Sequence, residues 1–275
     1  MKVVKAEHMG FCMGVRKAMQ TVENIIEKEK VKKISTFGPL IHNRLVLSEL
    51  SGKGVEIIDN PEEAEGVVII RAHGVHPDIR KRLEEKADKV IDATCPRVLN
   101  SQKKVLEASK KGMHIVIAGD MNHGEVQGIS GYAESFDIIE SADQAYNLEI
   151  KIPALLISQT TFSEEEYSLI CGILKERYPD IEISRSICPA TNKRQKALSV
   201  MAEKVDAVLV IGGKNSANTV RLFQSALKLG KKAWHIENSD EIPQEIRNYN
   251  TVGITAGAST PDWIIKKVAD NLKLY

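Results

Sequence analysis

Three cysteines of this chain share one setting. Cys12, Cys95 and Cys188 each follow a short apolar run and stand directly before a helical pattern. Thiols at helix starts are more easily ionised, and three thiolates brought together can hold a soft metal or an iron–sulfur cluster. A single cysteine is more often a small buried residue. The repeated setting is what favours a shared metal site here.

The fourth cysteine has a different setting. Cys171 lies inside the helical pattern "EEEYSLICGILKER", on the same apolar face as Tyr167, Ile170 and Leu174. No two cysteines are close enough for a CxxC redox or zinc motif. We therefore predict that Cys171 packs in the core and binds nothing.

Polar clusters recur at matching places after the three cysteines. In each copy, a strand-like run follows the cysteine and ends in a polar cluster, and two runs later a second polar cluster follows. The first two copies then have one more, closing run, which the third copy lacks. The spacing repeats even though the residues differ. The residues in these clusters are His42, His73, His123, Glu125, Thr160, Thr161, Ser216, Asn218 and Ser259.

The elements that must position these residues are about a dozen short β-branched runs, most of them separated by helical patterns. This alternation predicts an α/β protein with parallel strands, and the repeat predicts three pseudo-symmetric lobes around a common centre, where the three cysteines could hold a soft metal or an iron–sulfur cluster. We place the lobes at residues 13–95, 96–188 and 189–275, and expect the spare N-terminal run, 1–12, to complete the third. Helix starts are marked by Pro96, Pro189, Thr260 and a capping box of Ser163 with Glu166.

Ligands of open α/β sheets bind beyond the carboxyl ends of strands, where all these clusters are expected to lie. Histidine rings and the glycine-rich turns around Ser216, Asn218 and Ser259 can donate hydrogen bonds to a phosphate. Each such residue alone is more often a cap or a surface residue. The turn "IGGKNSAN" matches neither the P-loop nor the GxGxxG fingerprint, which argues against a nucleotide site.

Composition narrows the partners and the location. The 275 residues carry 38 basic and 37 acidic side chains, so charge gives no reason to expect nucleic acid or a membrane as partner. The first ten residues include Glu7 and His8, which does not fit a signal peptide, and no apolar run is long enough to cross a bilayer. We expect a cytoplasmic protein.

The chain resembles the 4-hydroxy-3-methylbut-2-enyl diphosphate reductase family, which catalyses the last step of non-mevalonate isoprenoid synthesis. The resemblance rests on nine motifs in order along nearly the whole chain. They are "GFCMGV", "GPLIHN", "RAHG", "ATCP", "NHGE", "SQTT", "ICPATNKRQ", "KNSAN" and "GAST". One position departs, because Ala217 stands where the family often has a second serine.

The resemblance implies a 4Fe–4S cluster on Cys12, Cys95 and Cys188, with one iron left open as a Lewis acid needs. It implies a reductive dehydroxylation of the allylic diphosphate to isopentenyl and dimethylallyl diphosphate. The diphosphate would be bound by His42, His73, His123, Thr160, Ser216, Asn218 and Ser259. Glu125 would be the proton donor, its pKa raised by a dry pocket and the nearby diphosphate, with Thr160 assisting and Thr161 in support.

Electrons must come from outside, because no flavin or nicotinamide motif is present in the sequence; a ferredoxin or flavodoxin is the natural donor. Two other interpretations stay open. One is a zinc hydrolase that uses the same thiolates with Glu125 as base. The other is a non-catalytic iron–sulfur sensor of phosphorylated metabolites.

Overall fold

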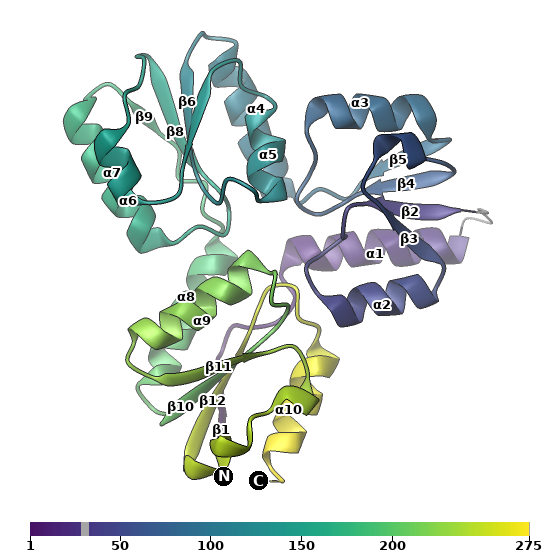
Figure 1. Ribbon diagram of the computed structural model, residues 1–275, viewed down its shortest axis with the longest axis vertical. Helices are drawn as coiled ribbons and strands as arrows, with labels where there is room; N and C mark the ends of the chain where they lie inside the picture. Colours follow the sequence, from purple (N-terminus) through teal and green to yellow (C-terminus); the bar gives the residue numbers. More distant parts are fainter. Residues whose placement is uncertain (29–32, 275) are drawn as a thin grey trace. The chain divides into compact units, whose positions relative to one another are not determined.

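The computed structural model describes residues 1–28 and 33–274, and they contain three parallel four-stranded sheets with helices around them (Figure 1). The predicted α/β lobes are thereby confirmed. The chain forms two compact units. The smaller comprises residues 1–16, 41–50 and 189–275, and the larger comprises 17–40 and 51–188. The lobe boundaries at 13–95, 96–188 and 189–275 with 1–12 remain predictions.

The sheet of the smaller unit has the order β1-β12-β10-β11. Strand β1 pairs in parallel with β12, with Lys2 opposite Thr251, so the N-terminal run joins the C-terminal sheet as predicted. Figure 1 shows β1 and α10 in the same unit. The elements are β1 (Lys2–Lys5), α8 (Pro189–Ala202), β10 (Ala207–Ile211), α9 (Ala217–Lys228), β11 (Lys232–Ile236), η2 (Ser239–Glu241), η3 (Gln244–Asn248), β12 (Thr251–Ala256) and α10 (Asp262–Leu272).

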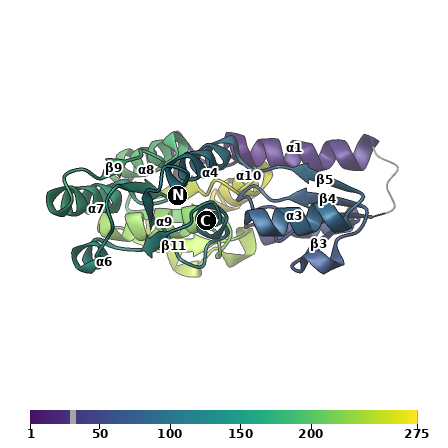
Figure 2. The ribbon, with the colours of Figure 1, turned by 90° about the horizontal axis from the view of Figure 1, so that it is seen from above.

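Two helices contain residues of both units, namely α1 (Met13–Lys28) and α2 (Arg44–Gly52). The first sheet of the larger unit has the order β3-β2-β4-β5, and Figure 2 shows α1 and α3 on opposite sides of it. Its elements are β2 (Ile34–Phe37), β3 (Val55–Ile58), η1 (Pro61–Glu63), β4 (Val67–Ile70), α3 (Pro77–Lys86) and β5 (Lys89–Asp92).

The second sheet of the larger unit has the order β7-β6-β8-β9. Its central strands β6 and β8 are buried at every residue, as expected for parallel strands covered on both faces. The elements are α4 (Pro96–Ser109), β6 (His114–Ala118), α5 (Gly124–Ser130), β7 (Phe136–Ile139), α6 (Ala142–Asn147), β8 (Ala154–Ser158), α7 (Glu164–Arg177) and β9 (Glu182–Ile183).

Helix starts follow the local sequence closely. Pro96 and Pro189 are the first residues of α4 and α8, and Ser163 caps α7 by accepting the N–H of Glu166 at 3.4 Å. The capping box is only half formed, because the Glu166 carboxylate accepts the N–H of Ala142 at 2.6 Å. That bond fixes the start of α6 beside α7 instead of closing the box.

Cys171 lies where the sequence predicts. It packs against the buried cluster that contains Tyr167, Ile170 and Leu174, and burial raises the pKa of its thiol. A thiol held protonated in this way is a poor metal ligand.

Within the described residues, no helix is long and apolar enough to cross a membrane.

Candidate active site

The three remaining cysteines are held by the same backbone bond in each sheet. Each stands directly before a helix, and each donates its N–H to the carbonyl oxygen two residues beyond the end of a neighbouring strand, β12, β4 or β8. The N···O distances are 3.1 Å for Cys12 to Ala258, 3.0 Å for Cys95 to Ala72 and 2.8 Å for Cys188 to Thr160. The repeat that the sequence shows in its spacing is therefore also a repeat of backbone geometry.

The central strands show a matching repeat. His42, His123 and Ser216 are each the fifth residue beyond the end of β2, β6 and β10. Two positions further on, the second and third copies carry Glu125 and Asn218 in the first turn of a helix. Each sheet thus presents one polar corner after its central strand and one after the strand beside it.

Within the larger unit, helix α5 approaches the segment after β4 closely because one of its faces has no side chains. Gly124, Gly128 and Gly131 lie on this face. Added Cβ atoms there would meet, respectively, the guanidinium of Arg71, the backbone of Val75 and the ring of His76. A larger residue at Gly131 would push α5 away from the ring of His76, and one at Gly124 would displace the Arg71 guanidinium. The glycines are therefore what lets the residues of "RAHG" and "NHGE" come together.

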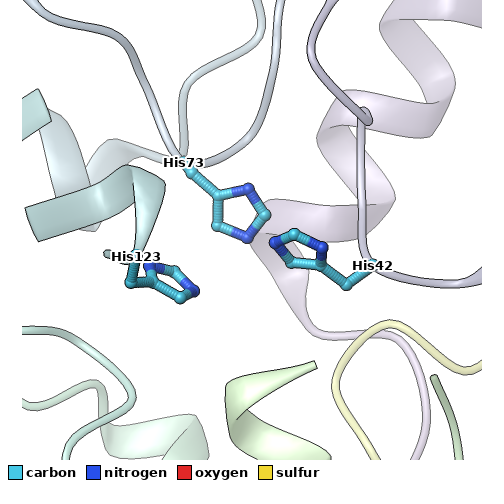
Figure 3. A group of neighbouring side chains, drawn as sticks. All are labelled: His42, His73 and His123. Atoms are coloured by element: carbon cyan, nitrogen blue, oxygen red, sulfur yellow. The ribbon is translucent and has the colours of Figure 1, made fainter. Parts of the chain in front are cut away.

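His73 and His123 meet at this close approach. Their ring centroids are 5.2 Å apart in an edge-to-face arrangement (Figure 3). His123 also caps α5, since its Nδ1 accepts the N–H of Glu125 at 3.1 Å. A neutral His123 therefore carries its proton on Nε2, where it can be donated to an anion.

Glu125 is buried, with 2% of its surface exposed, and is tied to Thr160 by two bonds. The Thr160 N–H donates to Oε1 at 2.6 Å and the Thr160 hydroxyl donates to Oε2 at 2.8 Å. The carbonyl of the same Thr160 accepts the N–H of Cys188 at 2.8 Å. One residue thus links the only buried carboxylate among the described residues to a cysteine at the start of α8.

The smaller unit gathers a second set of predicted site residues. The Ser259 hydroxyl lies 3.1 Å from the His42 carbonyl, to which it donates, and 3.4 Å from the Ser216 hydroxyl. Asn43 donates its side-chain amide to the Ser259 carbonyl at 2.9 Å. At Gly213, a Cβ would overlap the His42 carbonyl. These contacts fix His42 beside the turns that follow β10 and β12.

Asn218 lies in this second set and is buried, with 6% of its surface exposed. Its side-chain Nδ2 has no hydrogen-bond partner among the residues that the structure describes. A buried amide donor without a partner costs about 1–3 kcal/mol. Such a cost is commonly accepted where a ligand supplies the missing acceptor.

Arg71 is a residue at the site that the sequence analysis did not single out. Its guanidinium lies against Gly124 and also against Gly38, which follows β2 with φ +67°. Burial lowers the pKa of Arg71, and the charge of Asp59 acts against that shift. Arginine remains a cation in proteins, so Arg71 brings a positive charge beside His123 and Glu125. The residue is visible in the motif "RAHG", but only the structure shows where its side chain goes.

The fold is that of an α/β protein whose predicted site residues follow the carboxyl ends of parallel strands, where ligands of such sheets commonly bind. The particular family is given by comparison with known proteins. The family model described as LytB protein matches residues 3–273, and the chain belongs to this family.

Curated relatives cover nearly the full length of the chain. A protein of Treponema denticola is 45% identical over 99% of both chains, and one of Aquifex aeolicus is 36% identical over 98% of this chain and 96% of its own. Both are named 4-hydroxy-3-methylbut-2-enyl diphosphate reductase. The resemblance seen in the sequence and the predicted class, an oxidoreductase, are thereby confirmed.

Two solved structures are similar to this one. The reductase of Plasmodium falciparum has a TM-score of 0.90 and 30% identity, and covers 99% of this chain and 87% of its own. A second structure, titled as the terminal enzyme of the non-mevalonate pathway, has a TM-score of 0.70 and 35% identity over the whole of both chains.

Proposed function

We propose that this chain reduces (E)-4-hydroxy-3-methylbut-2-enyl diphosphate to isopentenyl diphosphate and dimethylallyl diphosphate. The reaction consumes two electrons and two protons, and the hydroxyl group leaves as water. The names of the relatives support the reductase role. The observation in the structure that carries the proposal is the buried pair of Glu125 and Thr160 attached to Cys188.

A 4Fe–4S cluster is the cofactor that we propose, held by Cys12, Cys95 and Cys188. The donor set fits, because all three thiols are only partly buried and each lies at a helix start. The Val15 N–H also points to the Cys12 sulfur at 3.4 Å, which is the kind of bond that stabilises a thiolate. When bound, the cluster would supply electrons and a Lewis-acidic iron with an open position.

The residues around it divide the remaining work. His73 and His123 in the larger unit, and His42, Ser216, Asn218 and Ser259 in the smaller, would donate hydrogen bonds to the diphosphate. The lone donor of Asn218 supports this assignment most directly. Arg71 would add a permanent positive charge near the first group. Binding the diphosphate fixes the reacting end of the substrate in place.

Glu125 would protonate the departing oxygen, and Thr160 would hold Glu125 in position. A hydroxyl both donates and accepts, so the Thr160 hydroxyl can accept a proton from a protonated Glu125 while donating its own. The backbone N–H of Thr160 keeps the carboxyl group oriented in either state. Burial of both residues keeps bulk water from supplying the proton instead.

The test is turnover of the allylic diphosphate under nitrogen with dithionite and methyl viologen as electron source. For Glu125→Gln we expect kcat to fall by about 10²–10⁴-fold, the usual contribution of a general acid. Thr160→Val keeps the N–H bond and loses the hydroxyl, so a smaller fall is expected. Glu134→Gln, which removes an exposed carboxylate of the same sheet region, is the control.

Iron and acid-labile sulfide are measured in every variant, so that loss of cluster is not mistaken for loss of the acid. Full turnover by Glu125→Gln with an intact cluster would exclude Glu125 as the proton donor.

We also propose that a ferredoxin or a flavodoxin supplies the electrons in place of dithionite.

A further inference from the structure

A groove of about 370 Å³ lies in the smaller unit between the N-terminal strand segment and helix α8. Its base is apolar, and Val200 adds an exposed apolar side chain, with 54% of its surface accessible. The residues that line it are Val4, Lys5, Ala6, Glu7, His8, Lys193, Lys196, Ala197, Val200, Met201 and Lys204.

The groove is strongly basic in a chain that is close to neutral. Lys193, Lys196 and Lys204 lie along one side and Lys5 on the other, whereas Glu7 is the single carboxylate among the lining residues described. All four lysines are exposed, and the charge of Lys5 also acts on Asp270. Lys193, Lys196 and Lys204 form no ion pair with another residue in the described part of the chain. Their charge is therefore available to an acidic partner.

Both sides of the groove continue directly into segments that carry proposed cluster ligands. Lys193 lies five residues after Cys188 on α8, which at 1.5 Å per residue is about 7.5 Å along the helix. On the other side, His8 lies in the short loop that leads from β1 to Cys12.

A buried arginine joins the two sides. Arg194 of α8, 6% exposed, donates Nη1 to the Ala190 carbonyl at 2.9 Å and Nη2 to the Gly10 carbonyl at 2.5 Å. The loop before Cys12 is thereby fixed to the first turn of α8. A protein seated in the groove would rest on a rigid surface close in the chain to two of the three ligands.

We propose that this groove is the docking site for a small acidic one-electron carrier protein of the ferredoxin type. The inference rests on the proposed function, which needs two electrons from outside. Each docked carrier gives up one electron and leaves oxidised, so two carriers are consumed for each substrate reduced and each water released. The lysines attract the carrier electrostatically, and the apolar base provides the area that a brief complex buries.

The test compares two electron sources on the holoenzyme. Lys193→Glu/Lys196→Glu is assayed with a reduced acidic ferredoxin and with dithionite and methyl viologen. With ferredoxin at low salt we expect kcat/KM to fall by about tenfold or more, since steering by charge contributes about 10–10³ to association rates. With methyl viologen the rate should stay unchanged. The fall should shrink as salt is raised.

The matched control is Lys228→Glu/Lys267→Glu, which reverses two exposed lysines of the same unit on α9 and α10. It alters net charge equally and should keep the ferredoxin rate. An equal fall in both double variants would show that net charge, and not this groove, sets the rate.

Each remaining outcome would contradict either the docking proposal or the proposed function. An unchanged ferredoxin rate in the groove variant would overturn the proposal, and so would an equal loss with both electron sources. If the groove variant lost binding to anionic phospholipid vesicles while its ferredoxin rate was kept, the groove would be a membrane contact instead. Absence of methyl viologen turnover in the unmodified enzyme would count against the proposed function, independently of docking.

Discussion

Two corners of this molecule are built alike and carry different polar side chains. After β6 come His123, Gly124 and Glu125, and after β10 the equivalent positions hold Ser216, Ala217 and Asn218. In the first corner both carboxylate oxygens of Glu125 are taken up by Thr160, whereas in the second the Nδ2 of Asn218 has no partner among the described residues.

In the proposed function, the corner after β6 is the acid corner and the corner after β10 is the binding corner, so that the repeated scaffold would divide the labour between them. The strand, turn and helix fix where the side chain stands, and the residue type decides whether that position holds an acid or a hydrogen-bond donor. Support from neighbours differs accordingly. An acid must be oriented before it reacts, so it has a dedicated partner, while a binding donor gains from being left for the ligand.

The largest effect is expected at the three cysteines, one of which occurs in each copy of the repeat. We expect Cys12→Ser, Cys95→Ser and Cys188→Ser each to lose turnover by at least about 10³-fold, because serine is a far weaker ligand for iron. Iron, sulfide and visible absorption of anaerobically purified protein report cluster loss. Cys171→Ser is the control and should retain cluster and turnover, at a cost of about 1 kcal/mol in stability. Full cluster content in any of the first three would remove that cysteine from the ligand set.

The second test takes the donor away from the binding corner. Asn218→Ala should raise KM for the allylic diphosphate by about tenfold to a hundredfold, the effect of about 1.5–3 kcal/mol lost from a bond to a charged group. Because Asn218 would bind the diphosphate and would take no part in proton transfer, kcat at saturating substrate should change little. Binding of inorganic diphosphate, measured by calorimetry, should weaken in parallel. If Asn218→Ala lowered kcat and left KM unchanged, the division between the two corners would be wrong.

The sequence predicts a good part of this arrangement. The short β-branched runs correspond to the strands that the structure describes, and the cysteines stand before helices as expected, because hydrophobic period and helix-start residues are local signals. The pairing of β1 with β12 also follows, since only the third copy lacks a closing run.

Other features depend on contacts between distant segments and have no local signal. The sequence "HGEVQG" does not show that its glycines face Arg71 and Val75, and the half-formed capping box at Ser163 depends on where Ala142 lies. Likewise, the place of residues 41–50 in the smaller unit follows from tertiary bonds such as that of Asn43 to Ser259.

The third test concerns the middle residue of the acid corner. Gly124→Ala would place a Cβ against the Arg71 guanidinium and should destabilise the protein by about 1–3 kcal/mol, as overpacking usually does. Thermal unfolding measures this loss. Gly128→Ala is the control, because its Cβ would lie 3.4–3.5 Å from its nearest neighbours, an ordinary to slightly tight contact. Arg71→Ala in the Gly124→Ala background should recover part of the loss if the clash is the cause. No recovery would assign the loss to some other contact of α5.

The smallest effect is expected at the equivalent residue of the binding corner. Ala217 is the first residue of α9 and is partly exposed, so a side chain is already accommodated there, unlike at Gly124. Ala217→Ser would add a hydroxyl donor beside Ser216 and should lower KM for the allylic diphosphate by a few-fold, about 0.5–1 kcal/mol. Ala217→Gly, which adds no donor, is the matched control and should not lower KM. The hydroxyl gains a bond only if the diphosphate lies within its reach, so an unchanged KM in Ala217→Ser would place the anion nearer the side chains of Asn218 and Ser259 than the side chain of residue 217.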